Sequence, residues 1–581
     1  MSVSPSVSVP HSPRSARWQA LTQVEACDRR VAARLDISPV SAAILRARGH
    51  DSPEAIEAFF SPHPGLLRDA ADLPDIERAI DRLWKAIQDR ESILIFGDYD
   101  VDGITSTALM VRSLQKLGAQ VSYRLPERDE SYGLTVAAVD EAATRKIALI
   151  VTTDCGITAI DAARRARELG IDLIITDHHE PESELPEAVA IVNPKRADSK
   201  YEFTGLSGCG VVYKLMTELL KRYQPTALSS FSERYLDLVA LSTIADCVPL
   251  HDENRYLVAR GLHQLYGTRK KGLRALIESA NIRDKGFYVG GDVSFRLAPR
   301  LNAAGRLDSP TLALRLLLSN DEAECAELAA QIEALNGQRR TDTDAALLEA
   351  HELVEREANL ADDRLLIAAG SGWRRGVVGL LAAKLVDKYH RPAFALNIEN
   401  GHAHGSGRSC ADFDLHALLE ESRELIVSGG GHAGACGLTV ETKRLPEFKE
   451  HALEYAADKL SMAELVPRHT ADCEAPGRDV TLQLAQEMVQ LEPCGSGNHS
   501  PVLLLRNARL QTAWPLKADH SKGRMMVDGQ SIEWIWWRSA DRLPEFERGS
   551  TVDCLFVPEV NEYRGQTSLQ LTLKDMRVAG D

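Results

Sequence analysis

The sequence predicts a mixed α/β protein with a parallel-sheet domain, a second α/β domain and a small C-terminal β-barrel. Between residues 92 and 176, short apolar segments alternate with helical segments, which is typical of a parallel sheet covered by helices on both faces. A charged, Ala- and Leu-rich helical pattern at residues 321–358, interrupted by Gly337, predicts a long helix that links two lobes. After about residue 467 the pattern changes to five short strands separated by polar turns, which favours a barrel of the oligonucleotide-binding type.

Composition limits the class of protein. The 581 residues suffice for three or four domains,. Lysine and arginine number 68 against 84 acidic residues, and the net charge of −16 argues against a protein coated for nonspecific nucleic-acid binding while leaving room for a local basic channel,. Ten cysteines form no CxxC pair, and no apolar run approaches the roughly 18 residues of a membrane span,. These features favour a reducing cytoplasm.

The chain divides into six predicted segments. Residues 1–18 are rich in Ser and Pro and are expected to form a disordered tail, with a transit peptide as the alternative,. Residues 19–90 have a helical pattern without candidate chemistry,. The parallel sheet is expected within residues 91–265, a connecting helical region within 266–360, the second α/β domain within 361–462 and the barrel within 463–581.

Three aspartates follow the first predicted strand of the sheet. Asp98, Asp100 and Asp102 occupy alternate positions before Gly103, where the chain turns into a helix expected to begin near Thr105 or Ser106,. Carboxylates this close repel one another unless a cation neutralises them, and Mg²⁺ and Mn²⁺ select oxygen ligands. The leading interpretation is therefore a metal site.

Two alternatives explain the same aspartates. One is a polar turn in which they cap the following helix. The other is an EF-hand calcium loop, which requires a helix before the loop and a bidentate Glu at its twelfth position. A strand precedes this loop and Leu109 stands at the twelfth position, so the EF-hand interpretation fails.

Further acids and imidazoles stand at the ends of other apolar segments. Asp154 follows the third strand, and His178 and His179 lie just after the fourth. Ligands of open α/β sheets bind at the carboxyl ends of strands, so these side chains are expected to converge. Asp246 ends an apolar helix before Pro249; taken alone it is more typical of a helix terminus than of a ligand.

Four of these motifs, in this order, resemble the signature motifs of the DHH phosphoesterase superfamily: DYDVDG at 98–103, DCGI at 154–157, DHH at 177–179 and IADCVPL at 244–250. Four downstream motifs resemble the RecJ family of single-strand-specific exonucleases: FRLAPRLNAAGRLD at 295–308, GWRRGVVGLLAAKL at 372–385, GSGRS at 405–409 and GGGHAGACGL at 429–438. The resemblance covers roughly residue 92 to the C-terminus.

The resemblance implies a bilobed, monomeric enzyme with a DHH catalytic domain, a DHH-associated substrate-binding domain and an OB-type nucleic-acid-binding domain. It would degrade single-stranded DNA from the 5′ end to mononucleotides with two Mn²⁺ or Mg²⁺ ions. Recombination and repair are the implied cellular roles, with a single-stranded-DNA-binding protein and a helicase as partners. Two other functions stay open, namely hydrolysis of small phosphate substrates and a noncatalytic replication scaffold.

The resemblance also assigns roles to single residues. Asp102, Asp154, His178 and Asp246 would bind one ion, while Asp100 and Asp154 would bind the second. Small-substrate relatives carry a metal-binding His four residues before the first paired aspartate, where this chain has Phe96. Asp98 is the candidate that would supply the missing ligand atom. His179 is expected either to act as an acid or to orient its neighbour.

Candidate substrate-binding residues lie in both lobes. In loops rich in glycine, Ser406 and Arg408 of GSGRS and His432 of GGGH have the side chains that suit a phosphate backbone,. In the first lobe the resemblance implicates Arg128, Arg300, Asn302 and Arg306, although each arginine alone is more typical of a surface salt bridge.

The barrel segment holds Trp514, Trp534, Trp536 and Trp537. Barrel tryptophans usually belong to the core. Alternation along the strand predicts that Trp534 and Trp536 share one face and that Trp537 lies on the other.

Overall fold

The computed structural model describes residues 16–127, 130, 133–282, 284–517, 519–563 and 565–580. The chain forms two compact units. The first unit comprises Ser61–Gly337 and Leu491–Ser500, and the second comprises Met1–Phe60, Gln338–Gln490 and Pro501–Asp581. Among the described residues, no helix combines the length and the apolar character needed to cross a membrane.

The first unit is built on a five-stranded parallel sheet with the strand order β3-β2-β4-β5-β6. The four predicted strands are confirmed, and a short fifth strand joins them. The strands are β2 (Ser92–Gly97), β3 (Gln120–Arg124), β4 (Leu149–Thr153), β5 (Asp172–Thr176) and β6 (Ala190–Val192).

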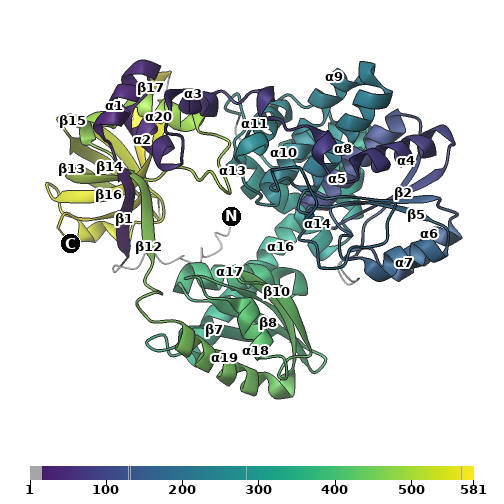
Figure 1. The fold of residues 1–581 in the computed structure, drawn as a ribbon. Helices are drawn as coiled ribbons and strands as arrows, with labels where there is room; N and C mark the ends of the chain where they lie inside the picture. Colours follow the sequence, from purple (N-terminus) through teal and green to yellow (C-terminus); the bar gives the residue numbers. More distant parts are fainter. Residues whose placement is uncertain are drawn as a thin grey trace. The chain divides into compact units, whose positions relative to one another are not determined.

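Helices cover both faces of this sheet because successive strand residues point to opposite sides. Ile93 and Ile95 of β2 pack into the larger core, whereas Leu94 and Phe96 pack into a smaller one. Figure 1 shows α5 and α8 on one face and α6 and α7 on the other. The helices of the unit are α4 (Ile76–Gln88), α5 (Val101–Lys116), α6 (Val136–Thr144), α7 (Ile160–Glu168), α8 (Gly208–Tyr223), α9 (Pro225–Arg234), α10 (Leu236–Ala245), α11 (Asp252–Tyr266), α12 (Lys271–Ser279), α13 (Gly290–Asp292), the π-helical turn η3 (Val293–Leu297), α14 (Ala298–Leu307) and α15 (Thr311–Leu318).

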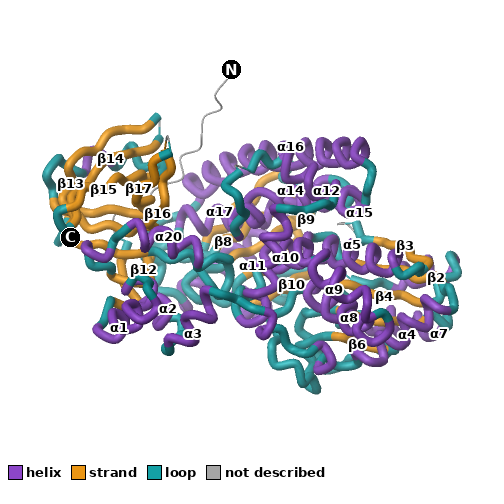
Figure 2. The backbone as a smooth tube through the Cα atoms, turned by 90° about the horizontal axis from the view of Figure 1, so that it is seen from above, coloured by secondary structure: helices purple, strands orange, loops and turns teal. Residues whose placement is uncertain are grey.

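The predicted long helix is α16 (Glu322–Glu357), which has 36 residues and continues through Gly337 without a break (Figure 2). At 1.5 Å per residue it is about 54 Å long. Its first part belongs to the first unit and its remainder to the second.

The second unit contains a mixed sheet with the strand order β10-β11-β9-β8-β7. Its strands are β7 (Leu366–Ser371), β8 (Ala393–Glu399), β9 (His402–Arg408), β10 (Ser428–His432) and β11 (Ala435–Glu441), and its helices are α17 (Arg375–Tyr389), α18 (Leu415–Glu421) and α19 (Leu445–Lys459).

The prediction that the motifs GSGRS and GGGH form loops was wrong. Most of GSGRS lies in β9, and GGGH lies in β10. The two glycines of GSGRS permit close strand packing instead of a turn. A Cβ atom at Gly405 would lie 2.1 Å from the carbonyl oxygen of Ala395, and one at Gly407 would lie 2.6 Å from the ring of Phe394. Any larger residue would separate these strands.

The predicted C-terminal barrel is confirmed. Strands β13-β14-β15-β17-β16 follow one another, and pairing of β13 with β16 closes the ring. The strands are β13 (Leu503–Leu516), β14 (His520–Val527), β15 (Gln530–Trp536), β16 (Thr551–Tyr563) and β17 (Gln566–Val578), preceded by β12 (Arg468–Glu474) and α20 (Leu482–Gln490). Trp534 and Trp536 are buried while Trp537 is 52% exposed, as alternation predicts, and Trp514 is also exposed.

The N-terminal region differs from the prediction. Residues 1–15 of the expected tail lie outside the described residues, but β1 (Arg17–Gln23) is a strand that pairs in parallel with β12. The helical segment follows it as α1 (Ala26–Leu35), α2 (Pro39–Ala47) and α3 (Pro53–Phe60). Trp18 Nε1 donates to the Asp575 carboxylate (3.2 Å), and the Ser38 amide donates to Glu487 (2.8 Å). Residues 17–60 therefore belong to the second unit, together with the barrel.

Candidate metal centre

The predicted acids and imidazoles gather at one edge of the parallel sheet of the first unit. Asp98 directly follows β2, Asp154 follows β4, and His178 stands two residues beyond β5. Asp246 arrives from a different direction, as the C-terminal cap of α10. The helix-terminus and ligand interpretations of Asp246 are therefore compatible.

Asp102 is fixed by a dense set of hydrogen bonds. Its carboxylate accepts from the backbone N–H groups of Gly208 (2.7 Å) and Cys209 (2.8 Å), at the start of α8. It also accepts from the hydroxyls of Ser242 (2.6 Å) and Ser106 (3.2 Å). The N-terminus of a helix favours negative charge, and the four hydrogen bonds hold the Asp102 carboxylate in one orientation.

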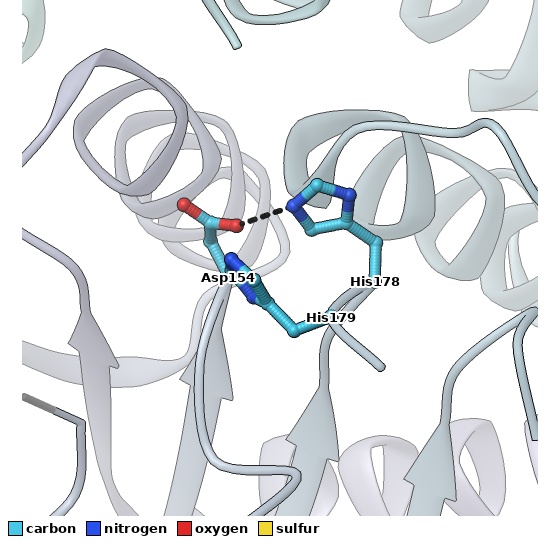
Figure 3. A group of neighbouring side chains, drawn as sticks. All are labelled: Asp154, His178 and His179. Atoms are coloured by element: carbon cyan, nitrogen blue, oxygen red, sulfur yellow. Dashed lines mark ion pairs between the residues drawn. The ribbon is translucent and has the colours of Figure 1, made fainter. Parts of the chain in front are cut away.

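His178 lies among three carboxylates, of which Figure 3 shows that of Asp154. Its Nε2 atom is 3.1 Å from Asp154 Oδ1, 3.6 Å from Asp102 Oδ2 and 3.5 Å from Asp246 Oδ2. His178 is buried, and within the described structure neither ring nitrogen has a hydrogen-bond partner. Burying an imidazole nitrogen without a hydrogen-bond partner costs free energy. The Nε2 atom of His178 is therefore suited to bind a metal ion.

A second group of oxygen atoms lies beside the first. One atom each of Asp98, Asp100 and Asp154 fall within 4.8 Å of one another, so Asp154 belongs to both groups. Phe96 is buried in the apolar core and contributes no ligand atom.

Asp100 rather than Thr105 or Ser106 begins helix α5, because its carboxylate accepts from the N–H groups of Asp102 and Gly103. The capping alternative is thus correct for Asp100.

The backbone at Asp154 has a conformation that few residues adopt. Its φ is +63°, in the left-handed region where Asp and Asn are tolerated,. The neighbouring helix leaves no space, since a Cβ atom at Gly208 would lie 2.6 Å from Asp154 Cβ. Strain of this kind is typical of functional sites.

The carboxylates repel one another in the absence of a cation. Burial and the charges of Asp102 and Asp100 raise the pKa of Asp246 to about 8, and burial together with Asp100 raises the pKa of Asp98 to about 7. Burial and the same neighbours raise the pKa of Asp154 well above its usual value. Burial lowers the pKa of His178, which favours the neutral imidazole that binds metals,.

His179 has a different environment from His178. Its Nδ1 lies 2.7 Å from Asp177 Oδ1, and the ring stands beside the Asp154 carboxylate (Figure 3). Burial disfavours its charged form, but the hydrogen bond and charge of Asp177 outweigh burial and raise the pKa of His179 to about 9. The contact with Asp177 therefore favours the charged form of His179.

The donor atoms fit a hard divalent cation. Carboxylate oxygens and one imidazole nitrogen form the set, and buried oxygens of Asp98 and Asp154 have no hydrogen-bond donor in the described structure. Adjacent ligand atoms of an octahedral shell with bonds of about 2.1 Å lie about 3 Å apart. The separations of 3.1–3.6 Å around His178 Nε2 approach this value.

The substrate-binding candidates of the first unit have mixed environments. Arg300 is buried and its guanidinium pairs with Glu333 while donating to the carbonyl oxygen of Arg296 (2.7 Å). Asn302 and Arg306 are partly exposed on α14. Arg128 lies outside the described residues. Arg300 is thus engaged in a structural ion pair, and its predicted contact with phosphate remains a prediction.

The candidates of the second unit lie on neighbouring strands. Ser406 and Arg408 are two positions apart on β9, so their side chains lie on the same face of the sheet,. Arg408 Nη1 donates to the carbonyl oxygen of Gly407, and a Cβ atom at Gly379 of α17 would lie 3.2 Å from Arg408 Nη2. His432 is exposed at the end of β10.

Sequence reasoning assigned no role to two sets of residues. Asp177 was quoted within DHH, yet it anchors the loop by accepting from the N–H groups of Ile157, His178 and His179. Ser242 and the amides that open α8 orient Asp102. The clustered small residues of SGCG at 207–210 were the available signal.

Comparison with known proteins agrees with this geometry. Residues 92–243 match the DHH family N-terminal domain, residues 362–458 the DHHA1 domain and residues 471–575 the RecJ OB domain. The single-stranded-DNA-specific exonuclease RecJ of Bacillus subtilis is 36% identical over 568 residues, which cover 97% of this chain and 71% of the relative. The chain belongs to the RecJ family.

Other relatives extend this finding. RecJ of Escherichia coli is 32% identical, over 93% of this chain and 96% of the relative. The crystal structure of RecJ in complex with Mn²⁺ from Thermus thermophilus superposes with a TM-score of 0.83 at 29% identity, covering 98% of this chain and 80% of that chain. A second structure from that organism contains Mg²⁺ and has a TM-score of 0.77 at 27% identity. Divalent cations are thus the cofactors that RecJ structures contain.

Proposed function

We propose that this protein is a single-stranded-DNA-specific exonuclease that hydrolyses phosphodiesters from the 5′ end to mononucleotides, with two divalent cations. The observation that carries the proposal is the convergence of Asp102, Asp154, His178 and Asp246 around one point at the carboxyl edge of a sheet. Membership of the RecJ family supports single-stranded DNA as the substrate.

The ligand sets follow from the two groups of atoms. Asp102, Asp154, His178 and Asp246, which meet around His178 Nε2, would hold one ion, and Asp98, Asp100 and Asp154 would hold the other. Bound cations would supply Lewis-acid stabilisation of the phosphoryl charge and lower the pKa of water. Asp154 would be shared between the two ions.

His179 is the residue that we assign to proton transfer. Asp177 holds its Nδ1 atom and favours the charged form of the ring, so Nε2 would donate a proton to the departing oxygen. Asp102 and Asp177 are themselves fixed by backbone N–H groups, which keeps the reacting groups in register without reorganisation.

The candidate substrate-binding residues come from both units. Ser406 and Arg408 of β9 would bind the 5′-terminal phosphate, which carries more charge than an internal diester. His432, Arg128, Asn302 and Arg306 would contact the phosphate backbone, and the barrel would raise the affinity for long strands. DNA recombination and repair, alongside a single-stranded-DNA-binding protein and a helicase, would be the setting.

The decisive experiment measures substrate and polarity together. Purified protein is incubated in Mn²⁺ with single strands labelled at the 5′ or the 3′ end, with blunt duplexes and with dinucleotides. We expect immediate release of a labelled mononucleotide from 5′-labelled single strands, a ladder of shortening products from 3′-labelled strands, and little cleavage of duplex. Degradation from the 3′ end would refute the polarity. Preference for dinucleotides would favour a small-phosphate hydrolase, and complete inactivity a noncatalytic scaffold.

A further inference from the structure

Phe295 is an aromatic side chain in an unusual place. It is 78% exposed, more than any other large apolar side chain among the described residues. It lies in the middle of the π-helical turn η3, between α13 and α14. Such turns are rare in proteins, but those that occur are often found at functional sites. A phenylalanine held in water calls for an explanation, because burying its ring would be favourable.

The backbone that presents this ring is fixed. Val293 and Leu297, two residues to either side, are buried in the core of the unit. Arg296 donates to the carbonyl oxygens of Ala280 and Asn281 at the end of α12, and Arg300 donates to the carbonyl oxygen of Arg296. The exposure of Phe295 therefore results from a clamped turn, and this clamp gives Arg300 a positioning role.

The same segment leads to the metal centre. Helix α14 continues directly from the turn, and a Cβ atom at its Gly305 would lie 2.8 Å from the carbonyl oxygen of Tyr99, between Asp98 and Asp100. The turn itself packs against α10, whose C-terminus carries Asp246. Ten residues separate Phe295 from Gly305, which corresponds to about 15 Å along a helix.

The surroundings of the ring determine what it can bind. Ser294 and Arg296 flank it in the chain, and a Cβ atom at Gly291 would lie 3.8 Å from the ring, so the glycine leaves this side of the ring uncovered. One isolated ring is too small for a protein interface, which buries many residues. It matches the face of one nucleobase, and stacking on aromatic side chains is how single strands are commonly bound.

We infer that Phe295 forms a nucleobase-binding site that stacks on a base of the strand whose phosphate lies in the metal centre. The inference rests on the proposed function, because it takes single-stranded DNA as the occupant. The site is independent of base identity, since every base has a π-face. Its role is to hold the strand in register a short distance from the scissile bond.

Three variants at this position separate stacking from simple hydrophobicity. Phe295→Ala removes the ring, Phe295→Leu retains apolar volume without a π-face, and Phe295→Trp retains stacking. We expect Phe295→Ala and Phe295→Leu to weaken binding of an oligothymidylate about fivefold to 150-fold, in line with loss of one base–aromatic stack. Phe295→Trp should bind like the wild type. Fluorescence anisotropy without divalent cation measures affinity in the absence of hydrolysis, and KM in Mn²⁺ provides a second measurement.

Salt dependence and abasic strands identify the contact. Losing an uncharged stack should leave the slope of log affinity against log salt unchanged, whereas losing a phosphate contact lowers it by about 0.7. On strands whose bases near the 5′ end are replaced by abasic sites, the wild type and Phe295→Ala should bind equally. Phe287→Ala is the matched control, because Phe287 is also exposed (41%) but lies outside the turn, and it should bind like the wild type.

Several outcomes would overturn this inference. Unchanged affinity in Phe295→Ala, an equal loss on abasic strands, or a loss in Phe295→Ala that Phe295→Leu fully restores would each exclude stacking. A fall in the thermal midpoint of Phe295→Ala would assign the ring to packing within the chain. Failure of the wild type to degrade single strands would instead refute the proposed function and is recorded in the same assay.

Discussion

Replacing Asp154 by Asn should uncouple the stability of the metal centre from its activity. Asn has the same shape, and it tolerates the left-handed φ of +63° that would strain Ala,. One Asp154 oxygen lacks a hydrogen-bond donor in the described structure and faces the charges of Asp102, Asp100 and Asp98. The ionised Asp154 side chain therefore does not stabilise the fold of the metal-free protein.

The expected magnitudes follow from this environment. The raised pKa of Asp154 means that the wild type loses stability as pH rises above the pKa of this carboxyl in the unfolded chain, and the amide escapes that loss,. At pH 8 the metal-free variant should be more stable by at least about 1 kcal/mol, since unpaired buried charges cost more than neutral groups. Hydrolysis should fall at least about a thousandfold, or ~4 kcal/mol of barrier.

The assay combines thermal unfolding, calorimetric titration with Mn²⁺ and turnover of single-stranded DNA. Mn²⁺ at a hundredfold excess over Kd should stabilise the wild type by about 2.7 kcal/mol and the variant by much less. Asp172→Asn is the control, because Asp172 stands at the opposite end of β5 and pairs with Arg82. It should leave Mn²⁺ binding and turnover unchanged. Wild-type Mn²⁺ affinity or near-native turnover in Asp154→Asn would refute the ligand assignment.

Three other predictions concern Asp102, Arg408 and His351. Asp102→Ala should lower the free energy of unfolding by about 3 kcal/mol, because the buried N–H groups of Gly208 and Cys209 lose their acceptor,; urea unfolding checks this, and a gain in stability would contradict it. Arg408→Ala should weaken binding of 5′-phosphorylated strands about tenfold and of 5′-hydroxyl strands less, with partial rescue by Lys; equal losses would place Arg408 on internal backbone. Burial and, after it, the charge of nearby lysines lower the pKa of His351 to about 4. The neutral imidazole therefore contributes fully to the free energy of unfolding above pH 6.5, and about 3 kcal/mol of that free energy is lost as the pH falls toward 4. His351→Gln should remove that part of the acid sensitivity in unfolding measured across this range, and an unchanged profile would assign the acid sensitivity to other groups.

Local sequence predicted the part of the metal centre that the parallel sheet itself positions. An apolar strand followed by Asp98, Asp154 or His178 defines both the strand and the edge at which it ends, because all strands point the same way,. Asp246 could not be placed in this way. It belongs to a helix whose packing against α5 is nonlocal, and only the resemblance to DHH proteins indicated its role.

Two errors have physical causes. The glycines of GSGRS were interpreted as a turn signal. Gly405 is instead required by strand packing, because a Cβ atom there would lie only 2.1 Å from a neighbouring carbonyl oxygen. Strand β1 was missed because its partner β12 begins more than 400 residues later. A strand takes its identity from the sheet that it joins, and no window of sequence around Trp18 contains that sheet.

The pairing of β1 with β12 has a consequence for synthesis of the protein on the ribosome. Roughly 440 residues separate the two strands, so at about 5–20 residues per second the emerging β1 waits about 20–90 s for its partner. The Trp18 side chain waits longer, because its partner Asp575 is translated near the end. During that interval the first unit can complete its own sheet. The N-terminal segment stays an unpaired strand edge, which is the state in which a nascent chain most needs a chaperone.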